Sequence, residues 1–500
     1  MMPMRHSIRL ALVAAVLAVA GCNRDQSQRI EVGVIGDKGI SLGDPLAPPA
    51  DEAQAVLRLA IAQGLVRFDA GGQVEPGLAE RWNVSDDGLS YIFRLASGEW
   101  PDGRRIMARD VARILNRLRN SAREDPTREA LGAVEEIVAM TDRVIEIKLH
   151  APRPGLLQLL AQPQFALIRE GVGTGPFRLR DVEGNTLPAK MGTAVQLRRR
   201  LRGFDGEPGE REDVILTALP AAQGIAAFSA GRIQLLLGGT LADLPLAQRA
   251  GLGRNTLRFD PASGLFGLAP SRAGGLLDDP DVRRLLSQAI DRDALIAALG
   301  VPGLVPRATL LQGGLGGLAD PVPPAWTAQP IADRRAALAA DVARLFGDEE
   351  RPTIKVVLPA GPGGDLLFAR LFADWGAIGI GVERAQDPRR ADLALLDRVA
   401  PSDSPAWFLR QFRCAVASIC IEEADTLLEA ARAAPNSAQR AAFFAQVSQM
   451  MDDEQLFIAL AAPVRWALVD DRAAGFQENR FARHPLTGVM RRAPSRGFAQ

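Results

Sequence analysis

Three glycine turn signals follow one another between residues 71 and 103, and they constrain the fold more than any other feature of this chain. They are Gly71-Gly72, Asp87-Gly88 and Asp102-Gly103, and they separate short runs of strand-forming residues. Such pairs supply the positive φ angles that tight turns need. We therefore predict hairpins over this segment.

The last of these turns opens the stretch EWPDGRRIMARDV, residues 99–111. Its Pro-Asp-Gly sequence at 101–103 fits a tight turn. Asp110 falls in the first turn of a predicted helix, where a carboxylate meets free N–H groups. Trp100 is most simply a core aromatic residue. Neither aspartate has a neighbouring nucleophile or base, so we interpret the stretch as a strand-to-helix corner that supports the fold.

The rest of the chain mixes strands and helices. Strand-like runs dominate up to residue 239, and from Asp279 onwards helical segments alternate with strands, as α/β units do. A helical pair is predicted over residues 422–455, with a break at Pro435-Asn436. The sequence therefore predicts the α/β class.

Length and charge set further bounds. A chain of 500 residues is too long for one ordinary core, so two or three domains are expected. It carries 59 basic and 59 acidic side chains, for a formal net charge of zero. A general nucleic-acid binder would carry a basic excess, so we expect no nucleic-acid partner.

The first 22 residues predict a signal peptide. A short apolar run follows Arg5 and Arg9 and ends in small residues directly before Cys22. This resembles a bacterial lipobox, which implies cleavage before Cys22 and a lipid anchor on its thiol; a plain secretory signal with a chance cysteine is the weaker alternative. By resemblance to Gram-negative lipoproteins, Asn23 favours the outer membrane. We expect a periplasmic, lipid-anchored protein.

Cysteine and histidine are scarce. Cys414 and Cys420 are six residues apart and would close a small disulfide loop in an oxidising envelope; two buried thiols are the alternative. The chain has three histidines, one of them within the signal, and no Cys/His cluster has zinc spacing. We expect no metal site and no cofactor.

The sequence contains no motif that fits a known catalytic or phosphate-binding site. In GVGTGPF, residues 171–177, Pro176 removes a donor and a strand follows, so the segment does not fit a phosphate loop. The sequence contains no GxSxG elbow and no HExxH pair. Acid pairs such as Asp278-Asp279 fall at turns, where aspartate caps and bends the chain. We therefore expect no enzyme activity.

The segment from residue 63 to residue 111 resembles the signature of the family 5 extracellular solute-binding proteins, the binding subunits of ABC importers for peptides, nickel and glycans. Further on, GTGPFRL, DVRRLLSQAIDRDALI and LFADWGAIGIGVE resemble later family motifs in the same order. The matching signature residues are Pro76, Leu78, Ala79, Trp82, Asp87, Gly88, Trp100, Asp102, Gly103, Ala108, Asp110 and Val111.

The resemblance implies a two-lobed periplasmic-binding-protein fold, type II-like, with an extra inserted domain and three domains in all. We place domain I at residues 23–65, 173–262 and 476–500, and the inserted domain II at 66–172. Domain III then covers residues 263–475. The lobes of this family close on a ligand between them by a hinge motion.

Three departures from the family bear on the ligand. Peptide-binding members hold the ligand's amino group with an aspartate, and an ungapped match places Pro401 at that position. The stretch ERAQDPRRADLALL is also too short for a cleft-lining helix that most members have. Tyr91 is the sole tyrosine, although family pockets often use several. By resemblance, the candidate ligand contacts are Lys38, Gly39, Ile40, Ser41, Leu265, Phe266, Asp397, Asp403, Trp407 and Phe408.

The resemblance implies a binding protein that delivers a small organic solute, such as a short peptide, to ABC permease subunits. We expect a monomer that performs no chemistry. The alternative is an envelope lipoprotein of the same fold that has lost ligand binding and acts as a scaffold. The lost aspartate motif and the missing helix motivate this alternative.

Overall fold

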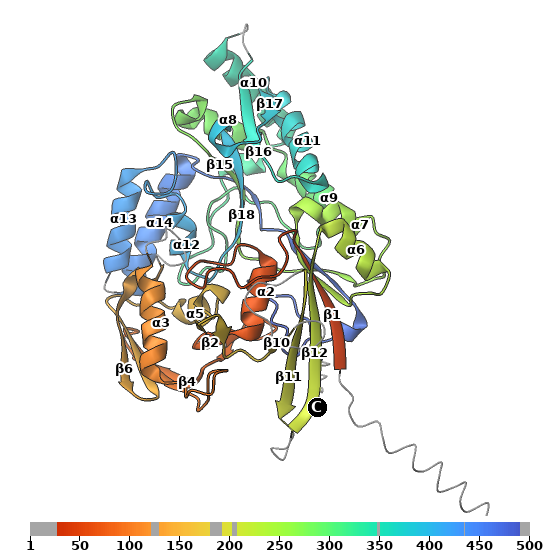
Figure 1. The fold of residues 1–500 in the computed structure, drawn as a ribbon. Helices are drawn as coiled ribbons and strands as arrows, with labels where there is room; N and C mark the ends of the chain where they lie inside the picture. Colours follow the sequence, from red (N-terminus) through yellow and green to blue (C-terminus); the bar gives the residue numbers. More distant parts are fainter. Residues whose placement is uncertain are drawn as a thin grey trace, which may run out of the picture.

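The computed structural model describes residues 28–121, 130–180, 193–202, 208–347, 351–434 and 436–490. The expected signal segment, with the lipidation site Cys22 and the neighbouring Asn23, lies outside these residues. Figure 1 shows one large sheet and a hairpin-rich unit in the lower half and a second large sheet with its helices above them.

The first large sheet has the strand order β10-β11-β12-β1-β13-β20-β14. Its central strand β1 runs parallel to both β12 and β13, and helix α2 packs on it through a shared apolar cluster. The elements are β1 (Gln28–Ile35), α2 (Glu52–Ile61), β10 (Arg178–Arg180), β11 (Ala194–Arg202), β12 (Pro208–Leu219), α6 (Ala221–Ser229), β13 (Leu235–Thr240), α7 (Leu244–Gln248), β14 (Leu257–Phe259) and β20 (Arg465–Val469).

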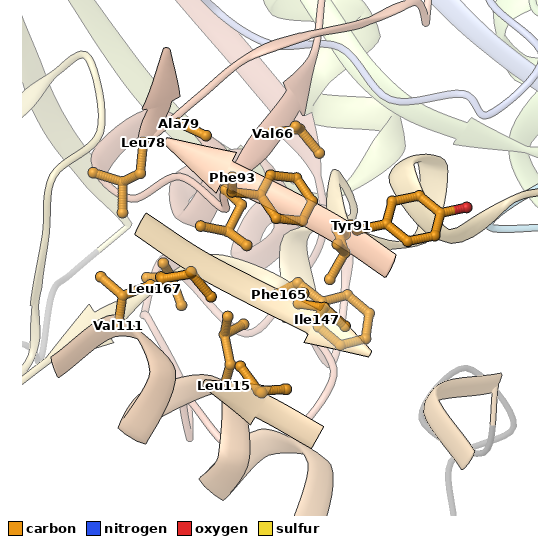
Figure 2. Packing of buried hydrophobic residues seen from close by; sticks show 14 of the residues in the cluster. Val66, Leu78, Ala79, Tyr91, Phe93, Val111, Leu115, Ile147, Phe165 and Leu167 are labelled. Atoms are coloured by element: carbon orange, nitrogen blue, oxygen red, sulfur yellow. The ribbon is translucent and has the colours of Figure 1, made fainter. Parts of the chain in front are cut away.

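The hairpin unit, residues 66–173, is built around the four-stranded antiparallel sheet β4-β5-β7-β6. Two short sheets, β2-β3 and β8-β9, flank it. Helix α3 closes the core, in which Tyr91, Phe93 and Phe165 are buried (Figure 2). The elements are β2 (Val66–Phe68), β3 (Val74–Pro76), β4 (Ala79–Val84), β5 (Ser90–Leu95), α3 (Ala108–Asn120), β6 (Val134–Thr141), β7 (Val144–Leu149), α5 (Leu156–Leu160), β8 (Ile168–Arg169) and β9 (Val172–Gly173).

The hairpins and the corner form as the sequence predicts. Gly72, Gly88 and Gly103 all have positive φ, at 77°, 68° and 80°. At the corner, Trp100 is buried at 2% exposure, and Asp102 accepts from the backbone N–H of Arg104 at 3.0 Å. This stretch therefore supports the fold, and local chain chemistry is enough to specify it.

The second large sheet has the order β17-β16-β18-β15-β19 and carries helices α8 to α14. Helices α13 and α14 are the predicted pair, and Asn436 caps α14 by accepting from the N–H of Gln439. The elements are β15 (Gly264–Pro270), α8 (Pro280–Ala289), α9 (Arg292–Leu299), α10 (Ile331–Phe346), β16 (Thr353–Val357), α11 (Pro362–Gly376), β17 (Gly381–Arg384), β18 (Leu393–Val399), α12 (Pro405–Arg410), α13 (Glu422–Ala433), α14 (Ser437–Asp453) and β19 (Ile458–Ala461).

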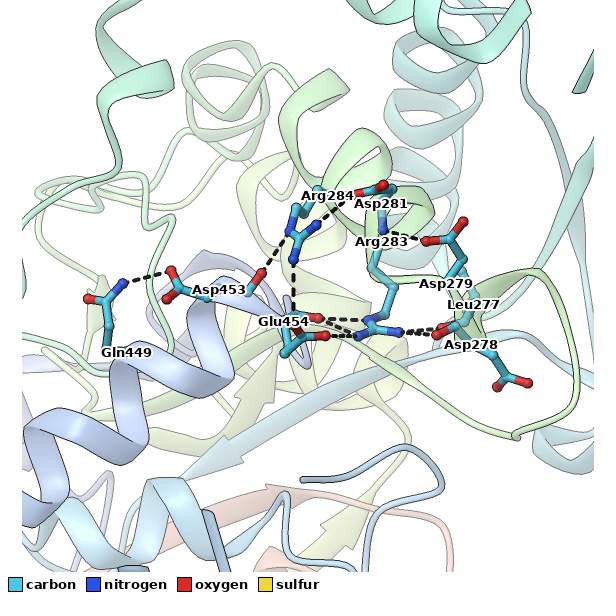
Figure 3. Close-up of polar contacts among 9 residues, drawn as sticks. All are labelled: Leu277, Asp278, Asp279, Asp281, Arg283, Arg284, Gln449, Asp453 and Glu454. Carbon is cyan, nitrogen blue, oxygen red and sulfur yellow. Dashed lines mark hydrogen bonds and ion pairs between the residues drawn. The ribbon is translucent and has the colours of Figure 1, made fainter. Parts of the chain in front are cut away.

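A polar network joins α8 to the end of α14 (Figure 3). The Arg283 guanidinium donates to the carbonyl of Glu454 at 2.6 and 2.8 Å and to that of Leu277 at 2.6 Å. Asp279 caps α8 by accepting from the N–H of Asp281 at 2.8 Å. The acid pair at 278–279 therefore has a structural role, as its position at a turn predicts.

The chain passes between the two large sheets at residues 260–263 and again at residues 462–464. We call residues 28–259 with 465–490 the first lobe and residues 264–461 the second lobe. The expected domain III included residues 465–469, but these form β20 and pair with β13 and β14 of the first sheet. We propose that the return to domain I comes at 462–464 instead of at 476.

The packing of the second-lobe core can be tested by substitution of Trp375. Its side chain is fully buried on α11, and its indole N–H donates to the carbonyl of Leu286 at 2.9 Å. We expect Trp375→Ala to lower the free energy of unfolding by about 3–5 kcal/mol in urea denaturation. The control Phe372→Ala removes a ring that is 58% exposed on the same helix, and it should change stability by less than about 1 kcal/mol. Equal losses would contradict this packing.

Asp452 on α14 should make stability depend on pH. Burial raises the pKa of its carboxyl to about 7, against the opposing backbone N–H of Leu310. The folded chain therefore binds more protons than the unfolded chain between about pH 4 and that value, so stability falls as pH rises through this window. Urea denaturation should show this decline in the wild type and a flatter profile in Asp452→Asn. The exposed neighbour Asp453→Asn should keep the wild-type slope.

Candidate functional site

A cavity of about 720 Å³ lies between the two lobes, beside the crossings of the chain. We call it the cleft. The first lobe lines it with Pro48, Pro49, Ala50, Glu52 and residues 238–240, and the second lobe lines it with residues 397–401. The remaining lining residues are Gln162, Gln164, Asp260, Trp407, Gln411, Arg465, Trp466, Phe481, Ala482, Arg483 and His484.

An ion pair bridges the lobes inside the cleft. Asp397 lies near the end of β18, and Arg465 is the first residue of β20. The Arg465 Nη1 atom donates to both carboxylate oxygens of Asp397, at 2.8 and 3.0 Å. Burial raises the pKa of Asp397, and Arg465 opposes that rise. The pair thus neutralises a buried charge that neither lobe could hold alone at low cost.

A second pair anchors the first crossing. The Asp260 carboxylate lies 3.0 Å from His484 Nε2 and accepts from the backbone N–H of Asn479 at 2.9 Å. The imidazole of His484 packs on the Phe476 ring, with centroids 4.6 Å apart. Both members of the pair are almost fully buried. These contacts fix the C-terminal segment against the start of the crossing.

Further polar side chains tie the rim of the cleft together. Arg483 donates to Glu52 at 2.8 Å and to Gln162 at 3.3 Å. Gln162 in turn donates to the carbonyl of Pro401 at 2.8 Å, which links the hairpin unit to the second lobe. Most charged groups of the cleft therefore hold its walls as well as facing its interior.

Arg398 differs from the other cations of the cleft. Its side chain is exposed and donates to the amide oxygen of Gln411 at 2.7 Å. In the part of the chain that the structure describes, it forms no ion pair with a carboxylate. Arg398 is therefore a cation that a ligand carboxylate can reach without displacing an acidic partner.

The floor of the cleft is a tryptophan packed on glycine. The Trp466 indole N–H donates to the carbonyl of Thr240 at 2.8 Å. Its ring covers Gly239 so closely that a Cβ there would lie 2.1 Å from the ring. Only glycine allows this approach of β13 to the indole.

Of the expected contact residues, Asp397 and Trp407 line the cleft. Leu265, Phe266 and Phe408 are at most 1% exposed and belong to the apolar clusters of the second lobe. Leu265 and Phe266 pack in the core because β15 is covered on both faces, and Phe408 packs there from α12.

Residues 38–41 lie elsewhere in the first lobe. Lys38 is exposed and Gly39 is half-buried, whereas Ile40 is buried in the core shared by β1 and α2. Ser41 accepts from the side-chain amide of Gln54 at 3.3 Å. None of these four residues lines the cleft. Their role as ligand contacts stays a prediction.

Asp403 faces a smaller neighbouring pocket instead of the cleft. Arg480 lies 3.0 Å from its carboxylate, and Gln158 donates to it at 3.1 Å. The backbone N–H of Asp403 also donates to Gln158 at 3.1 Å. Asp403 therefore joins the lobes directly, and its charge is already balanced by an arginine.

Sequence reasoning missed Asp260, Arg465, Trp466 and His484. Asp397 and Arg465 are 68 residues apart, and Asp260 and His484 are 224 apart. No local pattern marks such pairs, because the fold alone brings them together. The one usable local signal is at the strand ends, since Asp260 directly follows β14 and Arg465 begins β20.

Cys414 and Cys420 are joined by a disulfide, with their Cα atoms 5.0 Å apart. The bridge closes the loop between α12 and α13, outside the cleft. Within the described ranges, no group of three or more His, Cys, Asp or Glu side chains could hold a metal ion. Across the same residues, no helix is both long and apolar enough to cross a membrane.

Comparison with known proteins assigns most of this chain to one family model. Residues 73–412 match the model described as bacterial extracellular solute-binding proteins, family 5. The chain is 24% identical to a probable di/tripeptide-binding protein 5 of Pseudomonas aeruginosa, over 85% of this chain and 89% of the relative. It is 22% identical to the dipeptide-binding protein of Escherichia coli, over 85% and 88% of the two chains.

The fold matches solved structures over almost the whole chain. The OppA protein of Haemophilus influenzae, in complex with the peptide RPPGFSPFR, superposes with a TM-score of 0.76 at 16% identity. The match covers 92% of this chain and 98% of that one. The expected two-lobed α/β fold is thereby confirmed.

Gly239 provides a test of the cleft floor. We expect Gly239→Ala to push Trp466 out of place and to lower the free energy of unfolding by about 1–3 kcal/mol, because a packed site cannot absorb the added methyl group. Urea denaturation followed by tryptophan fluorescence measures both effects. In the control Gly36→Ala, the new Cβ meets no atom within 4 Å. An unchanged Gly239→Ala protein would contradict the described packing.

Proposed function

The chain belongs to the bacterial extracellular solute-binding proteins of family 5, and on this premise we propose that it captures a small organic solute, a short peptide, in the cleft and delivers it to the permease of an ABC importer. The observation that carries the proposal is the cleft itself, about 720 Å³ in volume with walls from both lobes. This volume suits a small organic ligand, since such pockets span roughly 300–1,000 Å³.

The charges of the cleft favour a ligand with both an amino group and a carboxylate. Arg398 is available to the carboxylate, because its described partner is the neutral amide of Gln411. Asp397 is the candidate for the amino group, which would share the carboxylate with Arg465. Charge-assisted hydrogen bonds of this kind give orientation as well as affinity. A short peptide carries both groups at its two ends.

Hinged closure is the proposed mechanism of capture. The lobes are connected by two crossings of three and four residues, so small backbone changes there can open the cleft. Contacts such as Gln162 to Pro401 hold the lobes together in the described arrangement. A solute that touches both walls stabilises this closed arrangement and shifts the population towards it. We propose that the permease recognises this form and that the protein itself performs no chemistry.

We propose that the mature chain is a periplasmic monomer anchored by lipid at Cys22, with Asn23 favouring the outer membrane. The basis for the anchor is the sequence pattern alone, because both residues lie outside the described ranges. We further propose that the domain division follows the expected boundaries except at the end of domain III, which comes before β20 instead of at residue 475.

A scaffold protein is the second candidate function, and one observation favours it. Asp403, the nearest acidic residue to the expected aspartate position, is occupied by Arg480 and Gln158. A protein that no longer needs to open would keep such direct contacts between its lobes. In that case the cleft would hold no solute.

The test uses the mature chain, purified without lipid from residue 23 onwards and then denatured. Mass spectrometry should identify a stoichiometric peptide among the released molecules. Titration of di- and tripeptides by calorimetry should then show binding that Arg398→Gln weakens about tenfold or more, through loss of a charge-assisted hydrogen bond.

The matched control is Arg389→Gln, which removes an exposed arginine of the same lobe that does not line the cleft. It should leave peptide affinity unchanged. An absence of released solute, together with no heat signal from any peptide, would favour the scaffold.

A further inference from the structure

A second pocket, of about 360 Å³, lies between the lobes next to the cleft. The segment 401–403 separates the two: Pro401 lines the cleft, and Ser402 and Asp403 line the smaller pocket. The first lobe contributes residues 152–159 to its wall, and the second lobe contributes parts of α12 and α14. An occupant of this pocket would therefore touch both lobes.

Two arginines, one from each lobe, line this pocket. Arg153 follows β7 in the first lobe, and Arg440 lies on α14 in the second. The buried Nη2 of Arg153 and the buried Nε of Arg440 have no hydrogen-bond partner among the described residues. Buried polar groups are nearly always paired in folded proteins, so two orphaned guanidinium donors at one pocket need an explanation.

The surroundings of these arginines are strongly cationic. Burial, and after it the positive charges of Arg410, Arg440 and Arg432, together lower the pKa of Arg153 to about 10, against the opposing charge of Glu429. Glu429 itself lies 3.4 Å from Arg432, with which it forms an ion pair. Bringing like charges together away from water costs free energy, and a bound anion would offset that cost.

The rest of the wall is apolar or already neutralised. Asp403 is the one carboxylate among the lining residues, and Arg480 is its ion-pair partner. Leu156, Leu159 and Phe444 form much of the remaining wall. The pocket therefore combines two cations with an apolar surface.

We propose that this pocket is a second ligand site, which takes a small organic anion: Arg153 and Arg440 bind its carboxylate or phosphate group, and the apolar wall holds its body. In the bound form, the guanidinium groups of Arg153 and Arg440 turn their orphaned donors towards the ligand. Because its walls come from both lobes, the bound anion stabilises the closed arrangement. The inference does not depend on which solute occupies the cleft.

Calorimetric titration of the mature chain with four probes tests the proposal: hexanoate, hexyl phosphate, inorganic phosphate and hexanol. We expect saturable binding of hexanoate or hexyl phosphate, and the tighter of the two identifies the preferred anionic group. Arg153→Gln and Arg440→Gln should each weaken that binding about tenfold. Inorganic phosphate that binds as tightly as hexyl phosphate, or hexanol that binds as tightly as hexanoate, would overturn the proposal.

Two further variants separate binding in the pocket from a general charge effect and from misfolding of the arginine variants. Arg432→Gln removes a charge from the same cluster but not from the pocket wall, so affinity should change less than about threefold. Ala441→Phe fills the pocket while keeping both arginines in the chain, and it should abolish binding even if the arginine variants fold poorly. No saturable binding to the wild type, or undiminished binding to Ala441→Phe, would overturn the proposal.

Discussion

The chain crosses between its two large sheets twice, and the rest of the molecule depends on how these crossings are held. They lie side by side, because the backbone N–H of Asp260 donates to the carbonyl of Arg465 at 3.0 Å. Near them, Gly264 leaves no room for a Cβ, which would lie 2.1 Å from the carbonyl oxygen of Arg398. Two short, adjacent connections permit rotation of one lobe against the other while keeping the cleft between them. The position of the cleft is thus a consequence of topology.

The charged groups of the cleft stabilise its walls and also leave one cation available to a ligand. Asp397 and Arg465 neutralise each other across the lobes, and Asp260 lies 3.0 Å from the imidazole of His484, between the crossing and the C-terminal segment. Removing one partner of such a pair would leave a buried charge, which is far more costly than the pair itself. A ligand therefore gains most from Arg398, whose described partner is a neutral amide. Trp466, which packs on Gly239, forms the floor of the cleft and shapes it.

The sequence predicts what local chemistry determines. The hairpin turns, the corner at 99–111 and the helical pair after residue 422 follow from glycine, capping and apolar spacing, and the structure confirms them. The site is harder to predict from the sequence, because its ion pairs and hydrogen bonds join residues that are far apart in the chain. Buried strands such as β15 carry apolar residues on both faces, so nothing local tells a core residue like Phe266 from a ligand contact. Asp403 faces away from the cleft for the same reason: Gln158, 245 residues earlier, decides its contacts.

The most direct test of the central claim, that the lobes close on a solute, is a distance measurement between them. Spin labels at Glu136→Cys in the hairpin unit and Arg389→Cys in the second lobe, both exposed positions, report lobe separation by double electron–electron resonance. The purified protein with its solute should give one narrow distance distribution. After unfolding, removal of the solute and refolding, the distribution should become broader and shift, and adding the solute back should reverse the change. Identical distributions in all three states would contradict hinged capture.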